Sequence, residues 1–351
     1  MRQVWQAPPS AQPFMVAGSG TLAMDMAAAN MVRTGDRMLV VGTGYFSDRM
    51  QEILRRYGAD VAVVDAPPGS AVPLGEVDAA LKREKPKAVF VTHVDTSTGV
   101  RMDAQAVAKL AHEAGAMTVV DGVCATAAEP LSMTDGSVDI YLTGSQKAIG
   151  LPAGLAMLVV SERAMAARQA LTSPPPLYLD YQQWLPIMDA YETGGKAYFA
   201  TPATNLVQAA AVALQEIVDD TFGGHRGITA RTARHGHVAC AMNGAWDAYK
   251  LSHLCTAATD RGVTLSALRY PPGTGPDVVG HIGSHGVVVA PGLHPSCKTE
   301  YFRVGHMGWC ITQTDLLERT IEAVGLGLRD AGYAADMDAA REAFKRTLAH
   351  A

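Results

Sequence analysis

Short apolar runs alternate with longer helical patterns between residues 38 and 160, and this alternation limits the possible fold more than any other feature of the chain. Several runs are apolar almost throughout, as in strands that are buried on both faces of a parallel sheet. The sequence therefore predicts an α/β fold, with a mostly parallel seven-stranded sheet covered by helices. The predicted strands with clear limits are 38–42, 61–65, 88–93, 117–122, 139–144 and 155–160, and the helical patterns between them are 48–57, 77–83 and 104–114.

The pattern changes in the second half of the chain. Proline and glycine accumulate between residues 173 and 202, which predicts a long irregular connection. We place a domain boundary near 225–235, which gives a large α/β domain (1–230) and a smaller C-terminal α+β domain (231–351). The other predicted elements are helices at 21–32, 205–219 and 228–249, strands at 263–268, 286–290 and 301–304, and a helical stretch from 314.

Composition excludes several classes of protein. The 351 residues carry 29 Lys and Arg against 34 Asp and Glu, so no basic surface for nucleic acid is expected. Apolar runs are too short to span a membrane, and neither end resembles a targeting signal, so a cytoplasmic location is expected. The five cysteines are scattered and include no CxxC pair. Neither a metal site nor a disulfide framework is therefore expected.

Two charged residues follow predicted strands at the edge where open α/β sheets bind ligands. Asp121 ends one strand, and Lys147 follows another inside a turn rich in glycine and proline. A lysine amine in such a place can form a Schiff base with an aldehyde, and an aspartate can hold a pyridinium N–H⁺. Each residue alone also has an ordinary explanation, as a surface charge or a helix cap.

Other segments are compatible with ligand binding without requiring it. Residues 18–21 (GSGT) precede a predicted helix, where backbone N–H groups can bind a phosphate, although the same residues suit an ordinary capped loop. Residues 42–46 (GTGYF) lack the third glycine of a dinucleotide fingerprint, but the aromatic could stack on a planar cofactor. Residues 93–99 end a strand with several hydroxyls. Arg303 lies in an apolar strand and needs an anionic partner, either a substrate carboxylate or a structural ion pair.

In combination, these segments resemble one family over nearly the whole chain. GSGT, GTGYFSDRM, HVDTSTGV, VVDGVCAT, TGSQKAIGLPAG, YFATPATN and FRVGHMG occur in the order and spacing of class V aminotransferases, which depend on pyridoxal 5'-phosphate and have fold type I. The resemblance is strongest to alanine–glyoxylate and serine–glyoxylate (serine–pyruvate) aminotransferases. It implies a transaminase that moves an amino group from alanine or serine to glyoxylate or pyruvate by ping-pong chemistry.

The resemblance also implies a role for individual residues. Lys147 forms the Schiff base and moves the proton, and Asp121 pairs with the pyridinium nitrogen. Val123 and Phe46 enclose the ring from its two faces. Thr96 lies near the phenolic oxygen of the cofactor ring and near the substrate carboxylate, which Arg303 binds.

The cofactor phosphate is expected between two subunits of a homodimer with shared active sites. The residues implied for it are Ser19, Gly20, Thr21 and Gln146 of one subunit, with Tyr198 and Thr201 of the other. Two departures from the family pattern bear on this expectation. Only seventeen residues precede Gly18, where family members usually carry a longer arm, and Pro291-Gly292-Leu293 replaces the more usual Gly-Gly-Leu.

Three alternatives remain open at this stage. One is a pyridoxamine– or aminophosphonate–pyruvate transaminase of the same family. A second is a lyase like the cysteine desulfurases, for which Cys297 is a faint candidate nucleophile and Gln146, where a histidine is usual, argues against. The third is an inactive, truncated α/β binding protein.

Overall fold

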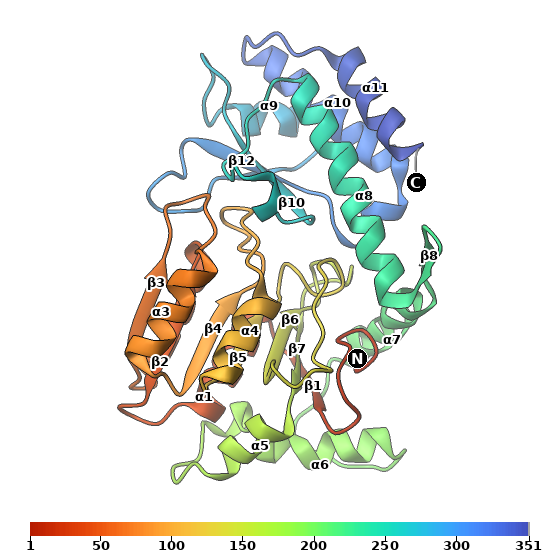
Figure 1. Ribbon diagram of the computed structural model, residues 1–351. Coiled ribbons are helices and arrows are strands. Elements are labelled where there is room, and N and C mark those ends of the chain that lie inside the picture. Colours follow the sequence, from red (N-terminus) through yellow and green to blue (C-terminus); the bar gives the residue numbers. More distant parts are fainter. Residues whose placement is uncertain (350–351) are drawn as a thin grey trace.

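A seven-stranded sheet forms the centre of the computed structural model, which describes residues 1–349 (Figure 1). The strand order is β1 (Gln12–Ala17), β7 (Leu155–Val160), β6 (Ile140–Gly144), β5 (Met117–Asp121), β4 (Ala88–Thr92), β2 (Arg37–Gly42) and β3 (Asp60–Asp65). Five neighbouring strands, from β6 to β3, are parallel. β7 is antiparallel to β6 and to β1. The predicted fold class is confirmed, and all six predicted strands in this region are present.

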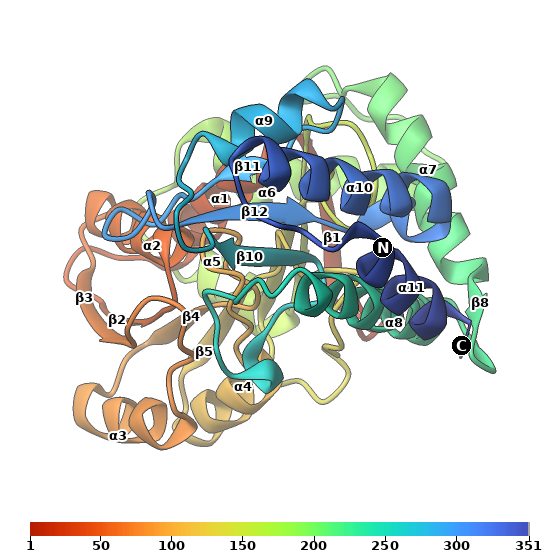
Figure 2. The ribbon, with the colours of Figure 1, turned by 90° about the horizontal axis from the view of Figure 1, so that it is seen from above.

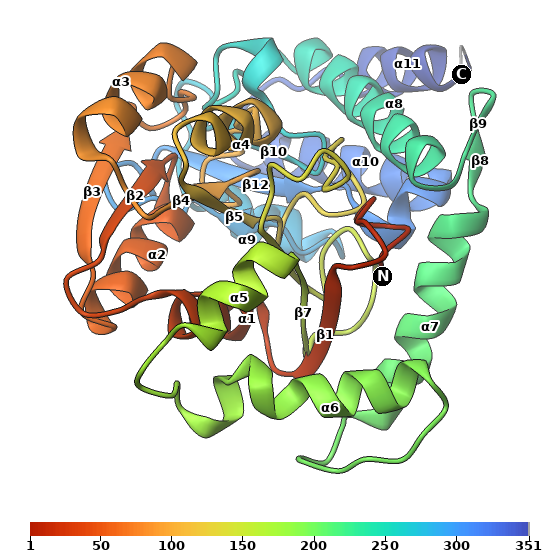
Figure 3. The same ribbon diagram turned by 60° about the horizontal axis from the view of Figure 1, so that its bottom comes forward.

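Alternate side chains of each strand enter two separate cores, because successive residues point to opposite faces of a sheet. On one face the core includes Val89 and Val91 together with residues of α3 (Leu74–Glu84), α4 (Ala104–Glu113) and α7 (Thr204–Asp219). On the other face it includes Phe90 and residues of four other helices. These are α1 (Gly20–Met31), α2 (Tyr45–Arg56), α5 (Glu162–Gln169) and α6 (Tyr181–Glu192). Figure 3 shows α5 and α6 below the sheet.

Two segments differ from the sequence-based expectations in this part. Strand β1 was not predicted, although it pairs with β7 along its whole length. The connection predicted as irregular over 173–202 contains a short 3₁₀ turn (Leu177–Leu179) and the helix α6, which includes Pro186. The helix forms because the Asp180 side chain accepts a hydrogen bond from the Gln182 N–H at its start. Its apolar residues at helical spacing are buried, among them Trp184 and Met188.

The C-terminal part has its own antiparallel sheet and core. Strands β10 (Leu265–Arg269), β12 (Tyr301–Gly305) and β11 (Ala290–Pro291) pair in that order. The predicted strand at 286–290 is wrong except at its last residue, and the helix α9 was not predicted. The remaining elements are the hairpin β8 (Thr221–Phe222) and β9 (His225–Arg226), α8 (Gly227–Ala248), a 3₁₀ turn (Ala258–Asp260), α9 (Val278–Ser284), a second 3₁₀ turn (Gly308–Thr312), α10 (Thr314–Asp330) and α11 (Met337–Leu348).

Seen from above, the small sheet lies over the carboxyl ends of the large one (Figure 2). Its core is separate and includes Trp246, Phe302 and Phe344. Among residues 1–349, no helix combines the length and the apolar composition needed to cross a lipid bilayer.

Candidate active site

The predicted site residues other than Tyr198 and Thr201 gather where the carboxyl ends of the large sheet face the small sheet (Figure 1). Strands β1, β6, β5, β4 and β2 all end at this edge, because β1 and β6 are both antiparallel to β7. The loops that follow them carry residues 18–21, 145–150, 121–123, 93–99 and 43–46. Open α/β sheets bind ligands at such an edge.

The turn before α1 is shaped to admit an anion. Ser19 occupies the N-cap position, but its side chain makes no capping hydrogen bond. The first N–H groups of a helix have no partner within it, and the helix dipole favours negative charge there. A Cβ on Gly20 would lie 2.6 Å from Val123 Cγ2, and one on Gly144 would lie 3.1 Å from the Gly20 nitrogen and 3.0 Å from Gln146 Oε1. Side chains larger than that of glycine at positions 20 and 144 would therefore fill the space around this turn, which we call the cradle.

Asp121 is a buried carboxylate with an incomplete set of partners. Its Oδ1 accepts a hydrogen bond from the Val123 N–H at 2.9 Å, and no hydrogen bond to the other oxygen is found among residues 1–349. Burial raises the pKa of Asp121 to about 7, and the negative charge of Asp95 adds to this, while the Val123 N–H and the charges of Arg49 and Lys147 oppose it. A pyridinium N–H⁺ would give this carboxylate both a hydrogen bond and a positive charge. These residues therefore fit the cofactor.

Asp95, in the loop after β4, connects this loop to the start of α2 at Phe46. The sequence analysis did not identify Asp95 as a site residue. Its carboxylate accepts hydrogen bonds from the Ser97 N–H (2.9 Å) and hydroxyl (2.6 Å), and from the N–H groups of Phe46 (3.2 Å) and Ser47 (3.4 Å). It therefore fixes the start of α2 and the position of the Phe46 backbone. The available signal was an acidic residue within the hydroxyl-rich segment HVDTSTG.

Arg49 is a second residue that sequence reasoning missed. Its Nη1 donates to Thr21 Oγ1 at 3.1 Å, and its Nη2 donates to the Tyr45 hydroxyl at 3.0 Å. The guanidinium carbon lies 5.0 Å from the ring centre of Tyr45 and 5.3 Å from that of Phe46. The signal in the sequence was the spacing of Arg49 from Tyr45 and Phe46, which places all three on one side of a helix.

Lys147 projects from a tight turn after β6. The Gly150 N–H donates to the Lys147 carbonyl at 2.9 Å, and the Leu151 N–H donates to the Ser145 carbonyl at 3.1 Å. The Ser145 hydroxyl donates to the Pro152 carbonyl at 2.7 Å, which closes the base of the turn. Within residues 1–349, neither an ion pair nor a hydrogen bond involves the Lys147 amine. The backbone of this turn is thus fixed while the amine is available.

Residues of the C-terminal part support the same turn. Gly308 lies against it, because a Cβ on Gly308 would be 2.8 Å from the Lys147 carbonyl oxygen. The Gly308 N–H donates to His235 Nε2 at 3.1 Å, and its carbonyl accepts from Arg231 Nη2 at 3.0 Å. Burial lowers the pKa of His235 to about 3, so the ring is neutral and can accept this hydrogen bond.

Arg303 connects β12 to the loop after β4. Its Nε donates to the Pro291 carbonyl and its Nη1 donates to the Thr96 carbonyl, each at 2.9 Å. No carboxylate of residues 1–349 forms an ion pair with it. On the same strand, the Tyr301 hydroxyl donates to the Ser97 carbonyl and accepts from the N–H groups of Leu293 and His294. Thr96 therefore contributes its main-chain oxygen to the position of Arg303.

Tyr198 and Thr201 are not joined to the other predicted phosphate ligands in the single chain. Tyr198 is 76% exposed, and its hydroxyl lies 3.3 Å from Thr201 Oγ1. In the described part of the chain, neither side chain forms a hydrogen bond with Ser19, Thr21 or Gln146.

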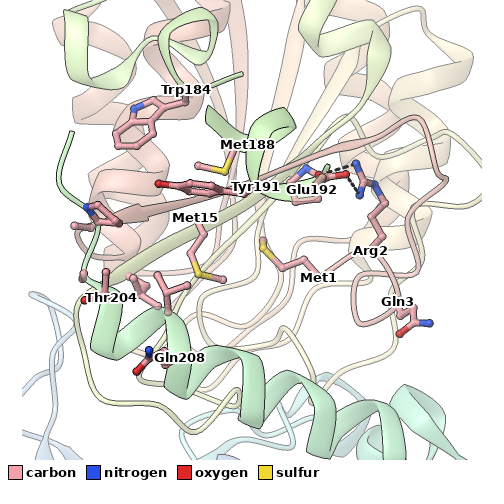
Figure 4. A pocket seen from close by; sticks show the side chains of 16 residues that line it. Met1, Arg2, Gln3, Met15, Trp184, Met188, Tyr191, Glu192, Thr204 and Gln208 are labelled. Carbon is pink, nitrogen blue, oxygen red and sulfur yellow. Dashed lines mark hydrogen bonds and ion pairs between the residues drawn. The ribbon is translucent and has the colours of Figure 1, made fainter. Parts of the chain in front are cut away.

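A separate groove lies beside this exposed segment (Figure 4). It has a volume of about 770 Å³ and lies between β1, α6 and the first turns of α7. Its walls are mainly apolar and include Met15, Met188 and Tyr191, and an ion pair between Arg2 and Glu192 (2.8 Å) borders one end. None of the residues that line it belongs to the predicted catalytic set.

Comparison with known proteins agrees with this arrangement. The family described as "Aminotransferase class-V" matches residues 1–176. Alanine–glyoxylate aminotransferase 1 of Saccharomyces cerevisiae is 38% identical to this chain over 85% of the chain and 78% of the relative. Serine–glyoxylate aminotransferase of Hyphomicrobium methylovorum is 29% identical over 91% of the chain and 77% of the relative.

A solved structure extends the similarity to three dimensions. The crystal structure of alanine–glyoxylate aminotransferase from Nostoc sp. superposes with a TM-score of 0.84 at 29% identity, and the match covers 93% of this chain and 84% of that one. The chain belongs to the class V aminotransferases, enzymes that use pyridoxal 5'-phosphate to move amino groups between small amino acids and oxo acids.

Proposed function

We propose that this chain moves the amino group of alanine or serine to glyoxylate or pyruvate. The observation that carries the proposal is the guanidinium of Arg303, which is held by two carbonyl oxygens at the sheet edge and forms no ion pair among residues 1–349. Such a group binds one carboxylate, and each of these four substrates has a single carboxylate and a small remainder. The names of relatives that act on alanine, serine and glyoxylate support the same choice.

The protein side of the reaction follows from the positions of two residues. Pyridoxal 5'-phosphate supplies, when bound, an aldehyde that joins amines and a ring that accepts negative charge from the substrate α-carbon. The Lys147 amine would hold the cofactor by its aldehyde between turnovers, and as a free amine it would carry the proton that leaves the substrate α-carbon. Asp121 keeps the ring nitrogen protonated through its carboxylate. The turn around Lys147 keeps its backbone fixed during these transfers.

The ring and the carboxylate of the substrate have separate binding groups. Val123 and Phe46 are proposed to enclose the ring, one on each face. Thr96 and Arg303 bind the carboxylate of the amino acid and then that of the oxo acid. One carboxylate site serves both half-reactions, because the donor and the acceptor occupy it in turn.

The proposed phosphate site needs a second copy of the chain. Ser19, Gly20, Thr21 and Gln146 supply donors from one subunit, and Tyr198 and Thr201 of the partner subunit complete them. The exposure of Tyr198 supports this, as does the position of its segment, which continues into the wall of the apolar groove at 202–204. A second copy that covers the groove makes the active sites shared. We also propose 1–230 and 231–351 as the two domains.

A half-reaction assay tests the proposed function. The protein is loaded with pyridoxal 5'-phosphate and mixed with one amino acid at a time, and the absorbance of the bound cofactor is followed. Alanine or serine should convert it to the pyridoxamine form, and glyoxylate or pyruvate should then restore it. Release of sulfide from cysteine would identify a desulfurase instead, and a response to free pyridoxamine alone would identify a pyridoxamine transaminase.

Two variants serve as controls for this assay. Lys147→Ala should remove the borohydride-reducible linkage and all turnover, because no other amine is proposed to hold the cofactor. Arg303→Gln should raise the KM for both substrates by roughly tenfold or more, since a charge-assisted pair is lost. A wild-type protein that forms no reducible linkage would contradict the proposed function.

A further inference from the structure

We propose that Arg49 binds the cofactor phosphate as its cationic partner. This inference rests on the proposed position of the phosphate at the start of α1. Arg49 lies within the segment GTGYFSDRM, but the family resemblance gave it no role.

Charge balance is the first reason. All the phosphate ligands named so far are uncharged donors: Ser19, Gly20, Thr21 and Gln146, with Tyr198 and Thr201 of the partner subunit. A phosphate monoester carries about −1.5 to −2 charges at neutral pH, whereas a helix N-terminus contributes roughly +0.5. A full positive charge beside the turn would offset most of the remainder.

The position of Arg49 is the second reason. The guanidinium reaches from α2 to the first turn of α1, where its Nη1 donates to Thr21 Oγ1 at 3.1 Å. Because the Thr21 oxygen accepts this hydrogen bond, its own hydrogen is free to point toward an anion. The Tyr45 hydroxyl holds the other side of the guanidinium at 3.0 Å. Arg49 and Thr21 thus form one donor surface at the edge of the cradle.

The third reason is that the charge of Arg49 is available. Within residues 1–349 it forms no ion pair, unlike Arg56 on the same helix, which pairs with Glu52 at 2.6 Å. An arginine side chain has five N–H donors. Among residues 1–349, the Arg49 side chain donates only two hydrogen bonds, one from Nη1 and one from Nη2. The electrostatic influence of Arg49 on Asp121 is consistent with a place inside the site.

The aromatic contacts of Arg49 have a separate consequence. The guanidinium also lies 5.3 Å from the ring centre of Phe46, which is proposed to stack on the cofactor ring. A change at Arg49 could therefore weaken cofactor binding by loosening Phe46 rather than by removing charge. The experiment must separate these two effects.

Pyridoxal, which has the same ring and aldehyde without the phosphate, makes this separation possible. The dissociation constants of pyridoxal 5'-phosphate and of pyridoxal are measured by absorbance for the wild-type protein, Arg49→Gln, Arg49→Lys and the control Arg55→Gln. Arg55 lies exposed on the same helix, and among residues 1–349 its side chain forms a hydrogen bond only with Gln51. Arg49→Gln should weaken binding of the phosphorylated form by on the order of tenfold and leave pyridoxal unchanged. Arg49→Lys should fall between, and Arg55→Gln should match the wild type.

Each other outcome has a defined meaning. Equal weakening for both compounds would overturn the proposal and leave Arg49 as a support for Phe46. Wild-type affinity of Arg49→Gln for pyridoxal 5'-phosphate would overturn it as well. Unchanged pyridoxal binding shows that the variant is folded at this site. If the wild-type protein forms no borohydride-reducible linkage with either compound, the proposed function fails instead.

Discussion

The buried environment of Asp121 makes its ionised form unfavourable unless a cationic group binds beside the carboxylate. It is 7% exposed, only one of its oxygens has a hydrogen bond among residues 1–349, and Asp95 contributes a like charge nearby. A carboxyl whose pKa is raised on folding binds a proton more tightly in the native state than in the unfolded state. Its ionisation therefore lowers stability as the pH rises. Cofactor binding would relieve this penalty.

We predict that Asp121→Asn stabilises the protein prepared without cofactor while it abolishes transamination. The penalty of ionising Asp121 is absent below about pH 4, grows as the pH approaches 7 and is complete above it. The variant should thus gain roughly 2 kcal/mol or more in free energy of unfolding at pH 8, with little gain at pH 4. Urea unfolding at the two pH values measures this. Asp189→Asn, on an exposed part of α6, is the control for replacing a carboxylate by an amide outside the site.

The candidate site was only partly predictable from single residues. Asp121 and Lys147 stand at the ends of clear strands, so their meeting at one edge follows from the parallel topology. Arg49 and Asp95 were missed because their importance depends on contacts between loops that are distant in sequence. The roles of the predicted ligands stay predictions, since placement at one edge does not by itself test binding.

At the scale of elements, the turn at Gly308 brings the C-terminal part of the chain against the Lys147 turn. Gly308 has a φ of +75° and follows β12, the strand that carries Arg303. Its backbone is bound from the other side by His235 and Arg231 of α8. The C-terminal part thus contacts the proposed cofactor site at two places: Gly308 packs against the Lys147 turn, and Arg303 of β12 binds the Thr96 carbonyl.

We expect Gly308→Ala to be more harmful than an alanine at another glycine with a similar backbone conformation. Gly273 has a φ of +85°, and a Cβ added to it would have no neighbour within 4 Å among residues 1–349. Gly273→Ala therefore reports only the conformational cost of a positive φ, roughly 1–2 kcal/mol. Gly308→Ala adds a contact 2.8 Å from the Lys147 carbonyl. Its free energy of unfolding should fall by a further ~1–2 kcal/mol, with slower formation of the reducible linkage. Equal effects of the two substitutions would contradict the contact.

Elements were predicted best where burial is complete. The parallel strands β4 and β5 consist of buried residues and were placed to within one residue. By contrast, α6 was missed because the prolines at 174–176 and 202 and the glycines at 194–195 suggested a loop, whereas buried aromatic packing stabilises the helix. Strand β1 was missed because its pattern, QPFMVA, is short, and its pairing partner β7 lies far along the chain.

At the scale of the whole molecule, the exposed Tyr198 segment and the apolar groove suggest that the functional unit is larger than one chain. If the phosphate ligands come from both subunits, a defect in one subunit can be corrected by the other. In a dimer whose active sites are each built from a single chain, one subunit cannot correct a defect in the other.

A mixed dimer provides the corresponding prediction. One subunit carries Lys147→Ala, and the other carries Tyr198→Phe with Thr201→Val. Each homodimer should have little activity, because both of its sites lack a required group. The mixed dimer, purified with two affinity tags, should regain about half of the wild-type activity, since one of its two sites is intact. No recovery would show that the two hydroxyls act within their own chain, and a monomer in sedimentation would contradict the dimer itself.

The pairing of β1 with β7 also constrains how the protein is made. Ala17 lies just before residues 18–21, the proposed phosphate turn, and pairs with Leu155 of β7. Strand β1 therefore has no pairing partner in the large sheet until β7 has been synthesised. Because pairings between distant segments form late, the phosphate turn can be completed only after β7 has left the ribosome. The proposed carboxylate site can form only later, because Arg303 lies on β12, which is synthesised after β7. Within one chain, the turn at residues 18–21 can therefore form before the proposed carboxylate site does.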